Sequence, residues 1–167
     1  MRRQLTLAVA LATGLLLAWQ QLTTGVPAHH LLARADMPSI SNWWGLLLLP
    51  LLAWVAASRI EARYGGVAAA SGAIPGCVGG LVFGAAVALF FSLGRTDLCE
   101  YLMQGLLLLA LFYPIYRSET LLGFAFGMTY AFGPVLPVLV ACVLAAGGYV
   151  LYQLPRVLWS AVGALRR

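Results

Sequence analysis

The chain has 167 residues, of which 62% are hydrophobic and only 9% charged, and its mean hydropathy is +0.92. Soluble domains carry about 25% charged residues, so this composition excludes a soluble enzyme and predicts one integral membrane domain over residues 1–167. The net charge of +5 comes from arginines at the ends of apolar segments, which indicates membrane topology and excludes nucleic-acid binding.

The apolar segments predict an all-α, polytopic membrane helix bundle with five or six transmembrane helices, since a span needs about 20 residues. The first segment follows two arginines and resembles a signal peptide. Polar residues follow directly after the bulky Trp19 with no clear small-x-small cleavage site before them, so we expect an uncleaved helix. The predicted spans are approximately 5–21, 43–58, 66–93, 102–117, 120–132 and 135–154, with an interfacial C-terminal helix at 156–167.

The most polar part of the chain is the first loop of the predicted outer face, residues 20–42, and a second outer loop on the same face holds further polar residues. His29, His30 and Asp36 are candidate metal ligands, and an acid/base site on the same face is a related alternative. No HxxxH, HExxH or paired-cysteine spacing occurs, so a solvated loop or a vestibule is also consistent. Asn42, before the interfacial pair Trp43-Trp44, is a predicted helix cap. The remaining members of this outer-loop polar cluster are Arg34, Arg95, Asp97 and Glu100.

The third segment has a small residue at every fourth position, which forms a groove along one helix face. This glycine ladder predicts close helix packing within the chain, or contact with a second copy or another membrane protein. Pro75 interrupts the segment, but the spacing continues on both sides, so we expect one kinked helix. The ladder comprises Ala68, Gly72, Gly76, Gly80, Gly84, Ala88 and Ser92.

The last apolar segment is too long for one span and is interrupted at Gly133-Pro134. The alternatives are one kinked helix and two helices joined at a turn. With two helices and a cytoplasmic N-terminus, eight arginines lie inside and two outside, which favours six helices with both termini cytoplasmic. The segment 120–132 is short and is also consistent with a half-span or a re-entrant piece.

An internal repeat is suggested by two similar stretches. Gly45 and four leucines precede Arg59-x-Glu61, and Gly105 and four leucines precede Arg117-x-Glu119, at an offset of 58 to 60 residues. Chance similarity is the alternative. Each Arg and Glu pair is expected at the cytoplasmic end of a span, where charged side chains reach water.

Candidate pathway or hinge residues lie at the proline and glycine interruptions and at buried hydroxyl groups. No charged residue lies well inside a predicted span, which argues against a proton-driven pump. These candidates are Gly133, Pro134, Pro137, Thr129, Tyr130 and Pro75.

The sequence favours a small transporter-like or channel-like protein for a small solute or ion, in contact with the lipid bilayer of a bacterial inner membrane. The alternatives are a membrane-embedded enzyme or metal-binding protein with an outer-face site, and an assembly or scaffold subunit. The absence of a nucleotide-binding, hydrolase or haem-attachment motif favours a non-enzyme, and no cofactor is indicated.

Overall fold

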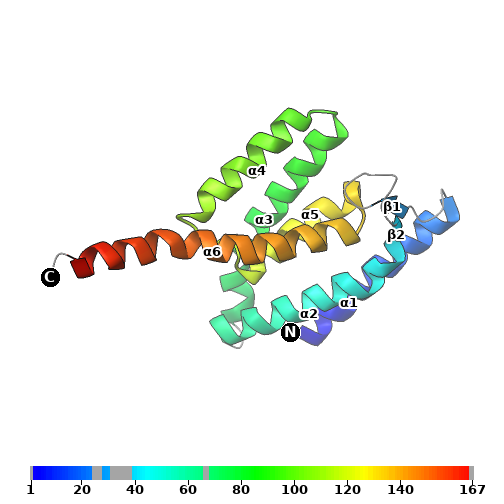
Figure 1. Cartoon of the computed structure of the whole chain (residues 1–167). Coiled ribbons are helices and arrows are strands. Elements are labelled where there is room, and N and C mark those ends of the chain that lie inside the picture. Colours follow the sequence, from blue (N-terminus) through cyan, green and yellow to red (C-terminus); the bar gives the residue numbers. More distant parts are fainter. Residues whose placement is uncertain (1, 24–27, 31–38, 66–67, 166–167) are drawn as a thin grey trace.

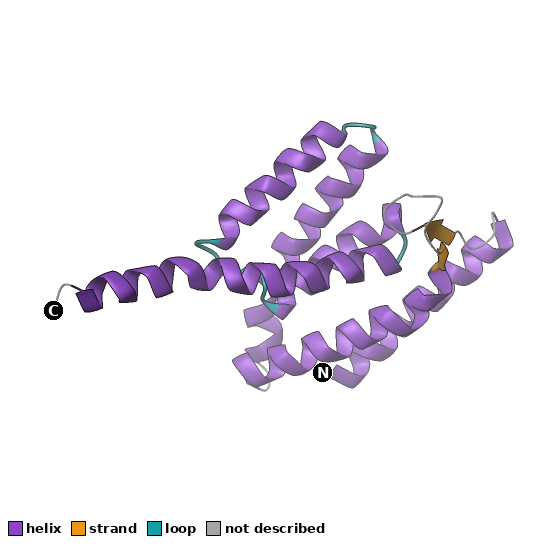
Figure 2. Ribbon diagram, viewed as in Figure 1, coloured by secondary structure: helices purple, strands orange, loops and turns teal. Residues whose placement is uncertain are grey.

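The computed structural model describes residues 2–23, 28–30, 39–65 and 68–165, and this part of the chain is almost entirely helical (Figures 1 and 2). A short antiparallel ribbon joins the first two helices. The elements are α1 (Arg2–Thr23), β1 (Ala28–His30), β2 (Ser39–Ser41), a 3₁₀ turn (Asn42–Trp44), α2 (Gly45–Tyr64), α3 (Ala68–Ser92), α4 (Thr96–Ala110), α5 (Ser118–Phe132) and α6 (Val135–Leu165).

Several of these helices suit a lipid bilayer. Four segments are long and apolar enough to cross a membrane, namely Arg2–Thr23, Asn42–Tyr64, Ser71–Ser92 and Val135–Ser160. Helices α4 and α5 have 15 residues each. At 1.5 Å per residue such a helix is about 22 Å long, which is shorter than the hydrocarbon core of about 30 Å. The described helices therefore provide four segments of spanning length, against the five or six spans predicted.

The prolines have different effects on the helices. Helix α3 continues through Pro75, as expected. The last apolar segment divides into α5 and α6 at Gly133, where φ is +69°. Of the two alternatives for this segment, two helices joined at a turn is therefore confirmed. Beyond 154 we expected a separate interfacial helix. Instead, α6 runs unbroken through Pro155, and its residues 154–160 are all exposed (Figure 1).

Helix α5 is short but lies at the centre of the bundle. It packs against α2, α3 and α6, and most of its first two turns are buried. One core cluster joins α5 to α3, α4 and α6, and a second joins it to α1, α2 and α6. Because other helices cover α5, this short helix is enclosed by protein along much of its length.

Helices α3 and α5 run in the same direction and approach each other through glycines on both sides. A methyl group added at Gly80 would overlap the carbonyl oxygen of Thr120, and one added at Gly123 would overlap the carbonyl oxygen of Cys77. The same conflict recurs about one turn later on each helix. Only glycine permits this backbone separation, because any larger residue places a Cβ atom inside the neighbouring helix. The glycines in contact are Gly80, Gly84, Gly123 and Gly127.

Candidate functional site

A buried carboxylate lies where α2, α3 and α5 meet. Glu119 is in the first turn of α5 and only 3% exposed. A negative charge is favoured at this position by the helix dipole, but burial removes its contact with water. The sequence analysis placed Glu119 at a water-accessible helix end. The structure corrects this, because α2 and α3 cover the side chain.

Among the described residues, only one oxygen of the Glu119 carboxylate accepts hydrogen bonds. Arg63 Nη1 and Tyr64 Oη, both from the last turn of α2, donate to Oε1 at 3.1 Å each. The other oxygen, Oε2, is buried and has no hydrogen-bond partner among the described residues. A buried carboxylate is normally satisfied on both oxygens, so Oε2 is an acceptor available to a proton, a cation or a donor group.

The counterpart of Glu119 in the suggested repeat has a different environment. Glu61 accepts a hydrogen bond from the backbone N–H of Arg2 at 2.9 Å and has 29% of its side chain exposed. The two glutamates therefore occupy corresponding places in the sequence, but only Glu119 is enclosed.

The glycine ladder makes room for this group. A Cβ atom at Gly76 would lie 2.6 Å from Cγ of Glu119, and one at Gly72 would lie 2.5 Å from the ring of Tyr64. The N-terminal half of the ladder thus leaves space for the carboxylate and its tyrosine partner. The ladder face of Gly80 and Gly84 is occupied by α5 of the same chain, so contact with a second chain through that face would require α5 to move away.

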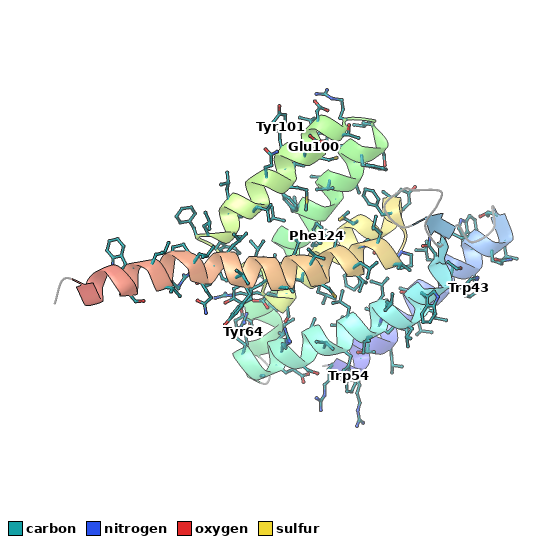
Figure 3. All side chains as sticks on the ribbon, in the orientation of Figure 1. Trp43, Trp54, Tyr64, Glu100, Tyr101 and Phe124 are labelled. Atoms are coloured by element: carbon teal, nitrogen blue, oxygen red, sulfur yellow. The ribbon has the colours of Figure 1, made fainter. Side chains whose placement is uncertain are left out.

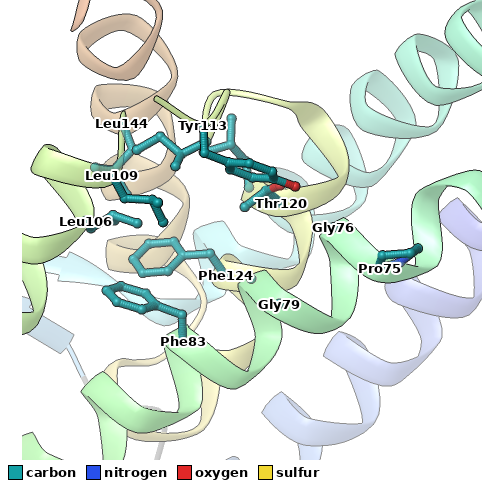
Figure 4. Close-up of a pocket in the computed structure, with 13 residues that line it drawn as sticks. Pro75, Gly76, Gly79, Phe83, Leu106, Leu109, Tyr113, Thr120, Phe124 and Leu144 are labelled. Carbon is teal, nitrogen blue, oxygen red and sulfur yellow. The ribbon is translucent and has the colours of Figure 1, made fainter. Parts of the chain in front are cut away.

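A cavity of about 310 Å³ lies beside this group, between α3, α4, α5 and α6 (Figure 4). We call it the glycine-walled cavity, because Gly76, Gly79 and Gly80 of α3 form one wall. Thr120, the residue after Glu119, also lines the cavity, and its buried Oγ1 has no hydrogen-bond partner in the part of the chain that the structure describes. The remaining lining is mainly aromatic and aliphatic and includes Phe83, Leu106, Leu109, Tyr113, Phe124 and Leu144.

The Gly133-Pro134 interruption is packed under the start of α2. Asn42 is only 2% exposed, and a Cβ atom at Gly133 would lie 2.7 Å from Cγ of Asn42. One turn later, a Cβ atom at Gly45 would overlap the ring of Pro134. The prediction that Asn42 caps a helix is wrong, since Ser41 accepts the hydrogen bond from the N–H of Trp43 and the Asn42 side chain is buried.

The other candidate pathway residues do not gather at one place. Thr129 Oγ1 donates to the carbonyl oxygen of Ala125 at 2.7 Å, and Tyr130 is 92% exposed on the outside of the bundle. Pro137 is fully buried in α6. Pro75 lines the glycine-walled cavity, so among these candidates it is the one that contacts the cavity.

The outer-loop residues are separated in the structure. His29 and His30 lie in β1, where they pair with Ile40 and Ser39 of β2, while Arg34 and Asp36 lie outside the described residues. Glu100 lies at the far end of the α3–α4 hairpin, away from the β ribbon (Figures 1 and 3). Among the described residues no group of three His, Cys, Asp or Glu side chains could hold a metal ion.

Arg95 and Asp97 form a surface ion pair with each other. Two nitrogens of the guanidinium donate to the two carboxylate oxygens at 3.0 and 2.9 Å. The hydrogen bond from Arg95 lowers the pKa of Asp97 below its usual value, and the pKa of Arg95 is raised by the same contact.

Sequence reasoning missed the central group of Arg63, Tyr64, Glu119 and Thr120. Of these four residues, the sequence analysis singled out only Glu119, as part of the Arg117-x-Glu119 stretch of the suggested repeat, and expected its side chain to reach water. That pattern does not reveal burial, which depends on the helices that cover the segment.

Searches against protein-family models, curated proteins and solved structures found no match to this chain.

Proposed function

We propose that this membrane protein is a small transporter or channel for a small solute or ion, and that Glu119 is its ion-responsive group. The observation that carries the proposal is the buried carboxylate with an unsatisfied Oε2, next to a cavity within an apolar helix bundle. Burying an ionisable side chain within an apolar helix bundle costs free energy, and such side chains are typical of ion pathways and proton relays. The sequence-based argument against proton coupling assumed no enclosed charge, and Glu119 removes that assumption.

The contacts of Glu119 support a coupling role. Arg63 is the charged partner of the carboxylate, and it comes from a different helix. A proton or cation bound to the carboxylate would weaken the attraction between Arg63 and Glu119, because the bound ion and the guanidinium would compete for the same negative charge. Occupancy of Glu119 would in this way change the contact between α2 and α5.

The short central helix also supports transport. Helix α5 ends at the Gly133-Pro134 turn, and its first residues are enclosed by neighbouring helices. Interrupted or short helices that end inside a bundle are common at transporter binding sites, since their termini lie within the protein.

The proposal includes a cytoplasmic membrane location with both termini in the cytoplasm. It rests on the excess of arginine in the loops on that side. Cysteine-accessibility labelling at the two termini and between α1 and α2 would test this orientation. Labelling of either terminus from outside intact cells would contradict it.

Flux into liposomes tests the function. Purified protein is reconstituted with an internal pH dye, or with Na⁺- or K⁺-sensitive dyes, and a potassium diffusion potential supplies the driving force. We expect wild-type flux of at least one of these ions, and loss of most of it in Glu119→Gln. Glu61→Gln is the matched control, because it neutralises the equivalent glutamate of the suggested repeat at a partly exposed site.

Circular dichroism and gel filtration establish that both variants fold as the wild type does. Absence of flux in the wild type for these ions would refute an ion pathway. Equal flux in Glu119→Gln and the wild type would refute the role of the carboxylate.

A further inference from the structure

We propose that the glycine-walled cavity binds an uncharged, largely apolar small molecule with one hydrogen-bonding oxygen, and that Thr120 Oγ1 is the group that binds this oxygen. As a statement about substrate class, this inference rests on the proposed function. As a statement about binding, it is tested separately below.

The hydroxyl of Thr120 lacks a bond that several other helical hydroxyls make. Thr129 and Ser92, for example, donate to the carbonyl oxygens four residues earlier at 2.7 and 2.8 Å. Thr120 lies in the first turn of α5, where the residue four positions earlier is outside the helix, so this local bond is not available. Its Oγ1 is buried beside the cavity and has no hydrogen-bond partner among the residues described. Such a group gains a hydrogen bond when a ligand supplies a donor or an acceptor.

The cavity lining defines the rest of the ligand. Phe83 and Phe124 lie along one side with ring centroids 6.1 Å apart, and leucines from α4 and α6 complete the wall (Figure 4). None of the described residues that line the cavity is charged. An ion or a charged lipid headgroup would lose its hydration there without a counter-charge, whereas an apolar body would gain contact with the rings and leucines.

The position of the cavity suggests the route of entry. Its α3 wall lies within Ser71–Ser92, a segment apolar enough to cross a membrane. Gly79 is exposed, and a Cβ atom there would meet nothing within 4 Å. The cavity is therefore open beside Gly79 at the level of the membrane, and a molecule dissolved in the bilayer can reach it without crossing an aqueous vestibule.

Photolabelling with a diazirine derivative of 1-decanol in nanodiscs tests the inference, with labelled peptides located by mass spectrometry. Unlabelled 1-decanol and n-decane serve as competitors that differ by one hydroxyl. We expect labelling of peptides from the cavity walls, with 1-decanol displacing the probe about three- to tenfold better than n-decane, as one hydrogen bond provides.

Two matched pairs of variants locate the site. Gly79→Leu should fill the open side of the cavity and reduce labelling severalfold. Gly105→Leu, at an equally open helical glycine outside the cavity, should leave labelling unchanged. Thr120→Val should abolish the preference for 1-decanol over n-decane. Thr129→Val, on the same helix, removes a hydroxyl that is already hydrogen-bonded and should retain the preference.

Three results would overturn the binding site. They are labelling that Gly79→Leu does not reduce, equal displacement by the two competitors in the wild type, and a preference that survives in Thr120→Val. Thermal unfolding of each variant shows whether it is folded, so loss of labelling through misfolding is recognised.

Binding and transport can fail separately. If labelling follows these expectations but the wild type carries no ion or solute, the binding site stands and the proposed function fails. If flux depends on Glu119 but labelling is not confined to the cavity, the proposed function stands and this ligand class fails.

Discussion

Replacing Gly80 by alanine should destabilise the protein, whereas the same change at the neighbouring Gly79 should not. The new Cβ at Gly80 would overlap the carbonyl oxygen of Thr120 and lie 2.9 Å from the backbone nitrogen of Phe124. At Gly79 a Cβ meets nothing within 4 Å. The two substitutions are chemically identical and adjacent in α3, so their difference isolates the contact with α5.

The magnitude follows from the separation that the methyl group requires. Ordinary contacts between heavy atoms are about 3.5 Å or longer, so the contact with the Phe124 nitrogen alone requires α3 and α5 to separate by about 0.6 Å around Gly80. The closer overlap with the Thr120 oxygen requires a larger shift. A gap of 0.5–1 Å loses roughly a quarter to a half of the dispersion energy of each affected atom pair. Overpacking of this kind costs about 1–3 kcal/mol. For Gly79→Ala we expect a change between zero and a gain of about 1 kcal/mol, from the better helix propensity of alanine.

The free energy of unfolding is measured by titration from mild detergent into SDS, followed by circular dichroism. The expected difference between the two variants is about 1–4 kcal/mol, with Gly80→Ala less stable. If the two variants have the same stability within about 0.5 kcal/mol, the close approach of α3 and α5 is not what holds these helices together.

Two further predictions concern the turns and the surface. Gly133→Ala should destabilise the protein by about 1–3 kcal/mol in the same assay, because φ is +69° and the new Cβ would overlap the Asn42 side chain. If Gly133→Ala costs as much in an Asn42→Ala background as in the wild type, the overlap with Asn42 is not a cause of the loss. The pKa of Asp97, measured by NMR, is expected below its usual value and should rise in Arg95→Ala. Because folding lowers this pKa, the ion pair contributes stability at neutral pH that is lost as the pH falls through the lowered value. An unchanged Asp97 titration in Arg95→Ala would contradict this assignment.

Local chemistry explains what could be predicted for the helices. Proline spacing and glycine conformation are properties of a few consecutive residues, so the continuity of α3 through Pro75 and the break at Gly133 were both predictable. The continuity of α6 was not predicted, because the sequence analysis ended the span at 154 and began a separate helix at 156, which leaves Pro155 between the two. The helix continues through it even though its residues 154–160 pack against little of the protein.

The candidate site was predictable only in fragments. Pro75, Gly76 and Gly80 were singled out for helix geometry, and the structure shows them in the wall of the cavity. Asn42 was assigned to the outer loop by its place in the chain, but it is buried against Gly133. Each of these positions depends on which distant segment lies opposite.

The sequence by itself determined that this chain forms apolar helices, several of them long enough to cross a membrane. It also determined where the main helix break falls and which face of α3 has no bulky side chains. These properties follow from composition and from spacing within one segment. Only the tertiary structure decided that Glu119 is enclosed and that a cavity lies beside it. It also decided that one oxygen of Glu119 and the hydroxyl of Thr120 have no partner within the described ranges of the chain. Burial and hydrogen-bond satisfaction depend on contacts between helices far apart in the chain, and no local pattern specifies those contacts.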